Sequence, residues 1–252
     1  MPYGSNDWLA LTQEPTLEPD LPICDPHHHF WDNRPASIPY QRYLLHELND
    51  DIYSGHNVVS TVFLEARSMY SADVDEGLRS VGEVEFVQGL AAASASGTYG
   101  TSRAAAGIMG HADLKLGSDV KPILEALQAA SPNRFRGIRH NITWNNDPTW
   151  DNRETEGIVK SAKFIEGAKV LRDQGLRLDI MQSFPQMTEI AEFAKSVPDL
   201  PIIVNHVGGV SRVGIYADKD DEIIPKWREG ITASVSYTHL RAHETRHDLV
   251  CR

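Results

Sequence analysis

The sequence predicts an α/β fold of the (β/α)₈ barrel class, and three observations support this prediction. Short apolar runs rich in β-branched residues alternate with longer segments of helical composition, the pattern of parallel strands joined by helical crossovers. The turn after the first run lacks the Gly-x-Gly-x-x-Gly loop of a dinucleotide-binding fold. Polar side chains gather instead where the runs end, the edge at which a (β/α)₈ barrel carries its chemistry.

Six strands and four helices can be assigned from the apolar pattern. The expected strands lie at 21–24, 58–64, 104–109, 135–142, 176–181 and 201–204. The expected helices lie at 74–95, 120–130, 161–174 and 186–196. Gly175 follows the third helix, in the position where a helix-ending glycine is common. Because helices alternate with strands, the strands should be parallel and their carboxyl ends should meet at one edge of the sheet.

The spacing of the strands predicts an incomplete barrel with about six of the eight βα units. The first and sixth strand ends, at His27 and His206, are 179 residues apart, or about 36 residues per unit. Two further units would need about 70 residues, whereas 46 follow His206. We therefore expect strands one and six to be exposed edges, and the chain to fold poorly and to have little or no activity.

Three segments are expected along the chain: an N-terminal extension at 1–20, a partial barrel at 21–234 and a non-native tail at 235–252. The tail, VSYTHLRAHETRHDLVCR, has neither strand nor helix periodicity. It resembles the translated read-through of a short-read sequencing adapter, and a genuine polar tail is the alternative. Its three histidines, His239, His243 and His247, are therefore not assigned as metal ligands.

The composition indicates a cytoplasmic protein with a small-molecule partner. With 24 Lys and Arg against 35 Asp and Glu, the formal net charge of −11 argues against binding to nucleic acid phosphates. The sequence shows no secretory signal and no apolar stretch long enough to cross a bilayer. Its two cysteines, Cys24 and Cys251, cannot form a disulfide framework and suit a reducing compartment. The oligomeric state is left open.

The strongest chemical signal is the run DPHHHFWD at 25–32, directly after the first expected strand. In an extended segment, alternation sends His27 and His29 to one side and His28 to the other. Two imidazoles that project together can hold one divalent ion, and histidine is a frequent zinc ligand. The alternative is a structural cluster of histidines. A His-x-His pair that ends the first strand of a βα series favours a metal or catalytic site.

The run DPHHHFWD resembles the Asp-x-His-x-His-x-Trp-Asp opening of the amidohydrolase superfamily, in its amidohydrolase-related branch of lactonases and metal-dependent decarboxylases. Further stretches that resemble this branch follow in order over about 21–228: TVFLEA at 61–66, AAASASGTYG at 91–100, AGIMGHADL at 106–114, FRGIRHN at 135–141 and IIVNHVGG at 202–209. The resemblance implies a (β/α)₈ barrel that hydrolyses a lactone, carboxylic ester or amide bond, often with one divalent metal ion.

The resemblance assigns roles to five residues. It places metal ligands at His27, His29 and His206, with zinc as the expected ion, although a core histidine is the alternative for His206. Arg139 resembles the family arginine that receives a substrate carboxylate, since its planar fork binds carboxylates through two bonds. A buried salt bridge to Glu65 or Asp113 is the alternative for Arg139. Glu65 could line the substrate pocket or orient a ligand histidine.

Four further polar residues receive weaker assignments. His111 and Asp113 are not assigned to the site, because Asp113 could simply cap the helix that follows it. His28 and His140 should point away from the barrel axis if their neighbours point towards it.

Two departures from the family pattern bear on the mechanism. Many relatives carry a histidine after strand five within His-Pro-Gln, where this chain has Phe184-Pro185-Gln186. The site could therefore bind metal weakly or act without it, and Gln182 would be a poor substitute ligand for zinc. The family's general base, an aspartate at the end of strand eight, has no counterpart, and Asp248 is not that residue.

The first functional hypothesis is thus a lactonase-like hydrolase acting on a small acidic substrate. The alternatives are a metal-dependent non-oxidative decarboxylase of the same branch and a non-catalytic barrel that binds a small molecule.

Overall fold

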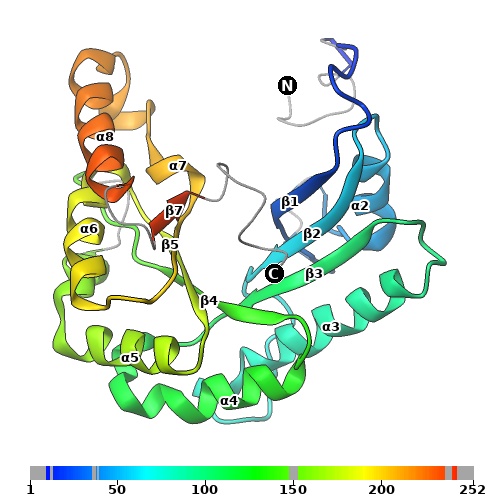
Figure 1. The fold of residues 1–252 in the computed structure, drawn as a ribbon, viewed down its shortest axis with the longest axis horizontal. Coiled ribbons are helices and arrows are strands. Elements are labelled where there is room, and N and C mark those ends of the chain that lie inside the picture. Colours follow the sequence, from blue (N-terminus) through cyan, green and yellow to red (C-terminus); the bar gives the residue numbers. More distant parts are fainter. Residues whose placement is uncertain are drawn as a thin grey trace.

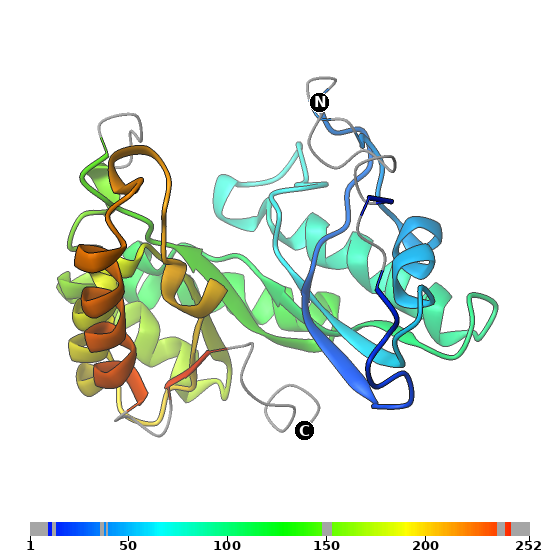
Figure 2. The same ribbon diagram turned by 90° about the horizontal axis from the view of Figure 1, so that it is seen from above.

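The computed structural model describes residues 10–11, 14–35, 38, 40–147, 153–235 and 240–242. Its sheet has seven strands in the order β1 to β7, each parallel to the next: β1 Ile23–His28, β2 Val58–Leu64, β3 Arg103–Gly110, β4 Phe135–Asn141, β5 Arg177–Met181, β6 Ile202–Val204 and β7 Leu240–Ala242. Figure 1 shows that the sheet curves into an open half-barrel, and Figure 2 shows the same arrangement from above. The predicted fold class, an incomplete (β/α)₈ barrel, is confirmed.

Helices connect the strands and cover the convex face of the sheet (Figure 1). The α-helices are α2 Leu45–Ile52, α3 Val81–Ala95, α4 Lys121–Ala130, α5 Ala162–Asp173, α6 Met187–Ser196, α7 His206–Gly209 and α8 Asp220–Val235. The 3₁₀ helices are η1 Glu76–Leu78, η2 Leu114–Val120, η3 Arg153–Thr155, η4 Ile158–Lys160, η5 Phe184–Gln186 and η6 Gly214–Tyr216. No helix in the described part of the chain is long and apolar enough to span a bilayer.

The main departures from the expected elements concern β1 and the segment at 74–95. Strand β1 runs from Ile23 to His28, so the DPHHHFWD motif lies within and directly after the strand. The single helix expected at 74–95 is divided into η1 and α3. Helices α2 and α8 were not assigned from the sequence.

The alternation of side chains along the strands separates a large outer core from a small inner one. Phe63 of β2 and Ile138 of β4 belong to the outer core between the sheet and its helices. On the opposite face Val62 and Leu64 pack with Met109 of β3 in a separate cluster. The concave face is therefore the one on which side chains from neighbouring strands can converge.

The edges of the sheet differ from the expectation for strand six. Instead of ending the sheet, β6 pairs with β7, and Ile202 lies opposite Leu240 in the register. The free edge of a parallel strand offers unpaired N–H and C=O groups, so three residues can pair with it without any apolar periodicity. Within the described residues, β1 and β7 are the two edge strands.

The remainder of the tail falls largely outside the described residues. Residues 236–239 and 243–252, which include His239, His243, His247 and Asp248, are not described, and neither are residues 1–9 and 12–13 of the N-terminal extension.

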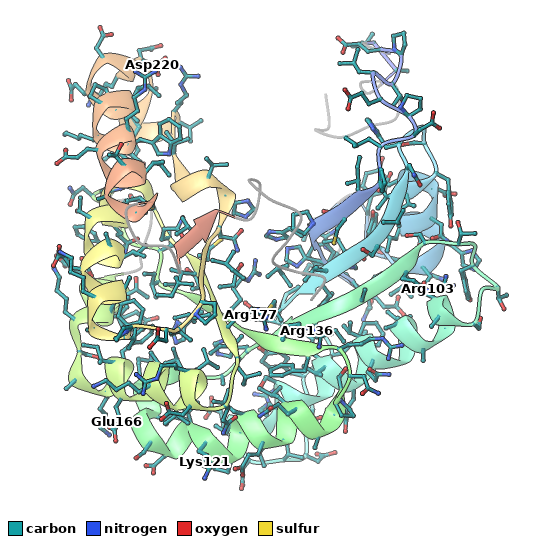
Figure 3. The ribbon with its side chains drawn as sticks, in the orientation of Figure 1. Arg103, Lys121, Arg136, Glu166, Arg177 and Asp220 are labelled. Atoms are coloured by element: carbon teal, nitrogen blue, oxygen red, sulfur yellow. The ribbon has the colours of Figure 1, made fainter. Side chains whose placement is uncertain are left out.

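Close backbone packing fixes the register of β4 against β5. Gly137 lies opposite Arg177, and a Cβ atom built on Gly137 would lie 2.0 Å from the Arg177 carbonyl oxygen. Figure 3 shows Arg136 and Arg177 near one another where these strands begin, at the end opposite the histidine motif. Burial, and then the positive charge of Arg136, lower the pKa of Arg177.

Candidate functional site

The His-x-His pair of the first strand forms a close side-chain cluster. His27 Nε2 and His29 Nε2 lie 3.1 Å apart, and their rings meet edge to face with centroids 4.8 Å apart. The Asp25 carboxylate accepts a hydrogen bond from the His27 backbone N–H at 3.1 Å, within strand β1. The predicted convergence of the two imidazoles is therefore present.

A backbone carbonyl of the neighbouring strand holds His29. Its Nδ1 lies 2.7 Å from the Leu64 oxygen, and since a carbonyl only accepts, Nδ1 carries the proton. In a neutral imidazole Nε2 is then the nitrogen with the free lone pair, and this is the atom that faces His27. Burial lowers the pKa of His29 to about 4, so the ring is neutral at physiological pH. The Leu64 carbonyl, and not the Glu65 carboxylate, orients this histidine.

His206 comes close to the pair from the far side of the half-barrel. Its ring centroid lies 4.9 Å from that of His27, with an angle of 30° between the rings. It directly follows Asn205 and begins the short turn after β6, where His206 and Val207 have φ values of 47° and 48°. A positive φ is uncommon for a β-branched residue and persists where surrounding contacts impose it.

Contacts from β5 support the His206 turn. The Gln182 Nε2 group donates to the Asn205 carbonyl oxygen at 2.8 Å. The Asn205 Nδ2 group donates to Asp179 Oδ1 at 2.5 Å, and all three side chains are buried. Gln182 thus holds the chain before His206 instead of replacing a metal ligand. Phe184, where many relatives are expected to have histidine, is buried against the ring of Tyr216 at 5.2 Å.

The geometry of the histidine pair fits a divalent metal ion. Zinc binds imidazole nitrogens at about 2.0–2.1 Å, so two such ligands in a tetrahedral site lie about 3.3 Å apart. The 3.1 Å between the two Nε2 atoms is close to that separation, and the proton on His29 Nδ1 leaves its Nε2 free to bind. In the described part of the chain, no three His, Cys, Asp or Glu side chains are gathered closely enough to hold one ion. His206 lies beside the pair without completing it.

Glu65 and Arg139 form a buried salt bridge across the ends of β2 and β4. Arg139 Nε lies 3.2 Å from Glu65 Oε1, and the two side chains are 12% and 6% exposed. A second guanidinium nitrogen donates to the Glu65 backbone oxygen. Of the two interpretations of Arg139, the salt bridge is therefore present, and the binding of a substrate carboxylate stays a prediction.

The residues around β3 and β4 have structural contacts. Asp113 caps η2 by accepting from the Lys115 N–H at 2.9 Å, as the alternative interpretation predicted, and lies 3.4 Å from His140 Nε2. His111 Nδ1 lies 3.2 Å from the Arg139 carbonyl oxygen. His140 packs against Phe164 of α5, on the convex side of the sheet.

His28 also points away from the axis, as predicted. Its Nε2 lies 2.8 Å from Thr61 Oγ1, and its ring packs against Phe30 and Phe63. Burial lowers the pKa of His28 to about 3, so this histidine is a neutral part of the core.

An open cavity of about 790 Å³ lies beside the histidine pair. Its walls include His27, His29 and the aromatic rings of Trp31, Tyr40 and Tyr43. The ring of Trp31 lies 4.9 Å from that of His29, and the Arg34 guanidinium lies 3.8 Å above the Trp31 ring centroid. A small organic molecule could therefore reach the pair from this side.

Glu83 of α3 was missed in the sequence analysis although it is fully buried near the site. Its Oε1 accepts from the backbone N–H groups of Ala66 and Ser68 at 3.0 and 2.8 Å. Burial raises the pKa of Glu83 to about 7. Helical spacing could have revealed it, because Glu83 lies four and eight residues before Val87 and Ala91 on one apolar stripe.

Comparison with known proteins identifies relatives of this arrangement. The family model described as "Amidohydrolase" matches residues 24–238. A curated relative from Sinorhizobium fredii, described as uncharacterized protein y4mH, is 27% identical over 202 residues, which cover 75% of this chain and 63% of the relative. The chain thus spans less than two thirds of the length of that relative.

Solved structures share the fold at low sequence identity. A zinc-bound amidohydrolase from Burkholderia multivorans has a TM-score of 0.63 and 19% identity, with 86% of this chain and 67% of that chain covered. A probable 2-pyrone-4,6-dicarboxylic acid hydrolase from Acinetobacter baumannii, with citric acid bound, has a TM-score of 0.51 and 11% identity, with 82% and 65% covered.

Proposed function

Because the chain belongs to the amidohydrolase family, we propose that it derives from a hydrolase that cleaves a lactone, carboxylic ester or amide bond of a small acidic substrate. The observation that carries this proposal is the pair of imidazole nitrogens 3.1 Å apart, one of them with its proton placed by the Leu64 carbonyl. The zinc in the Burkholderia multivorans relative and the citric acid in the Acinetobacter baumannii relative support the choice of metal and of an acidic substrate.

In this proposal His27 and His29 hold one divalent ion, with zinc as the preferred ion and His206 as the further ligand. A divalent ion bound there supplies Lewis acidity towards a carbonyl oxygen and lowers the pKa of a bound water. The chain's own contribution is to keep the His29 imidazole neutral and its Nε2 directed at His27. For His29 this follows from its burial and from the bond to Leu64.

We assign Arg139, which lies beside Glu65, as the group that binds the substrate carboxylate. Its guanidinium already has a fixed orientation, since Glu65 accepts from it through both a side-chain and a backbone oxygen. A planar guanidinium has five N–H donors, so donors remain for a second carboxylate.

We also infer that this chain turns over slowly. The family resemblance gives the general base to an aspartate at the end of an eighth strand, and the seven described strands include no counterpart. A hydrolase site without its base retains binding and electrostatic stabilisation but loses proton transfer, which contributes about 10²–10⁴-fold to rate.

Zinc titration tests the proposal directly. We expect the full chain to bind one equivalent of zinc and His27→Ala to weaken binding at least tenfold. His56→Ala, which removes an exposed histidine from the loop before β2, should leave binding unchanged. Equal zinc affinity in all three proteins would contradict the assignment.

Product analysis tests the reaction. Incubation with a panel of lactones and carboxylic esters of small acids should give slow ring opening or ester cleavage that a chelator abolishes. Release of carbon dioxide would instead indicate the decarboxylase alternative. Turnover that a chelator leaves unchanged would indicate a metal-independent hydrolase that relies on histidine and arginine.

A further inference from the structure

A single buried carboxyl group holds the segment that follows β2. Glu83 lies on α3, outside the histidine pair, and no part of its side chain is exposed. Its Oε1 accepts two backbone hydrogen bonds from one short stretch of chain, from Ala66 N at 3.0 Å and Ser68 N at 2.8 Å, and lies 3.3 Å from Ser68 Oγ. An oxygen that accepts two backbone N–H bonds from a loop fixes the backbone direction of that loop.

Ser68 carries this constraint across to the first strand. Its hydroxyl has a single proton, which it donates to the Phe30 carbonyl oxygen at 3.0 Å, the nearer of its two acceptors. Phe30 directly follows His29, and the His29 ring is held from the other side by the Leu64 carbonyl. The two segments are thus tied twice, once through the ring of His29 and once through Ser68.

A purely structural role does not require a carboxyl group at this position. Residue 83 lies on the apolar stripe that also contains Val87 and Ala91, where an apolar side chain would pack at no desolvation cost. Burying a carboxyl group is expensive unless its bonds are made. Among the described residues, Glu83 Oε1 bonds to the loop that follows Glu65, whereas the buried Oε2 has no hydrogen-bond partner. The bonds that offset part of this cost are therefore the ones that order the loop.

We propose that Glu83 is a positioning residue: its buried carboxyl fixes the segment 66–68 and, through Ser68 and the Phe30 carbonyl, sets the orientation of the His29 imidazole. The consequence for metal binding rests on the proposed function, whereas the consequence for the loop and the ring does not. Removal of a group that orients a metal-binding histidine lowers the metal affinity by about 10–100-fold.

Three variants of the full chain separate positioning from packing. Glu83→Ala removes every acceptor, whereas Glu83→Gln keeps one oxygen that can accept the same bonds. Glu85→Ala is the matched control, because Glu85 lies on the same helix but is exposed.

The first readout needs no metal. In Glu83→Ala we expect the amide hydrogens of Ala66 and Ser68 to exchange at least tenfold faster, with Leu127 of α4 unchanged. The ¹⁵N signals of His29 should show loss of the single Nδ1–H tautomer. Glu83→Gln and Glu85→Ala should match the wild type in both measurements.

The second readout is zinc affinity, measured with zinc alone against a competing chelator. We expect at least tenfold weaker binding in Glu83→Ala and less than threefold change in the other two variants. Uniform acceleration of exchange at Leu127 as well as at Ala66 would show that Glu83 only stabilises the fold, and would overturn the proposal. An unchanged His29 signal in Glu83→Ala would also overturn it. If the loop and ring respond but the wild type binds no zinc, positioning stands and the proposed metal site fails.

Discussion

Substitution of Arg139 should show how much the buried salt bridge with Glu65 contributes to the free energy of unfolding. Arg139→Met keeps an unbranched side chain but leaves the Glu65 carboxylate, 6% exposed, without its cation. At 3.2 Å, and with an effective dielectric constant of about 20, the attraction between the two charges is about 5 kcal/mol. Removal of one partner from a buried pair costs about 3–5 kcal/mol, mainly because the other charge remains buried. We expect Arg139→Met to lose stability in that range.

Urea unfolding of a double-mutant cycle measures this cost. Glu65→Leu alone should also destabilise, and the double variant Arg139→Met/Glu65→Leu should be more stable than the sum of the single losses predicts, since no unpaired charge remains. The exposed pair Lys121–Glu125, 3.8 Å apart and 63% and 58% exposed, is the control. Lys121→Met should change the free energy of unfolding by less than about 1 kcal/mol.

The outcome that refutes this reasoning is specific. If Arg139→Met costs no more than Lys121→Met, water screens the pair between Arg139 and Glu65, and the barrel mouth is open at this point. Arg139 would then be free to bind a substrate carboxylate without first giving up a strong partner.

Three further predictions concern Glu83, Gly137 and Gly89. Burial raises the pKa of Glu83 from 4.5 to about 7. Between these two pH values the folded chain therefore holds one more proton than the unfolded chain. The free energy of unfolding should fall by about 3 kcal/mol as the pH rises through this interval. Glu83→Gln should remove this contribution from urea unfolding curves recorded from pH 4.5 to 8, and an unchanged slope would contradict it. Gly137→Ala should prevent or severely weaken folding, because the new Cβ would meet the Arg177 carbonyl oxygen at 2.0 Å. Gly89 lies on α3, and a Cβ atom added to it would meet no other atom within 4 Å. Gly89→Ala should therefore raise the free energy of unfolding by about 0.5–1 kcal/mol. A lower free energy of unfolding in this variant would show that glycine itself is required.

The strands and the histidine pair could be predicted because each depends on local pattern. Runs of β-branched residues specify strands, and alternation alone puts His27 and His29 on one side of β1 and His28 on the other. The structure confirms this alternation. The His29 ring contacts the Leu64 carbonyl oxygen, whereas the His28 ring points to the other face and contacts the Thr61 hydroxyl.

The contacts of Arg139 could not be predicted, because its two interpretations differ only in tertiary geometry. Residues 65 and 139 lie 74 positions apart, and only the pairing of β2, β3 and β4 brings them within 3.2 Å. An arginine at the end of a predicted strand is equally compatible with a salt bridge and with a substrate-binding role.

The error at β7 has a different physical origin. Periodicity predicts no strand in segment 235–252, but periodicity reports only how a segment buries its side chains. Strand β7 pairs with β6 through its backbone, and backbone hydrogen bonding places no demand on the order of Leu240, Arg241 and Ala242. Three residues are also too few for an alternating pattern to be recognised. An open sheet edge can therefore recruit a segment whose sequence carries no strand signal.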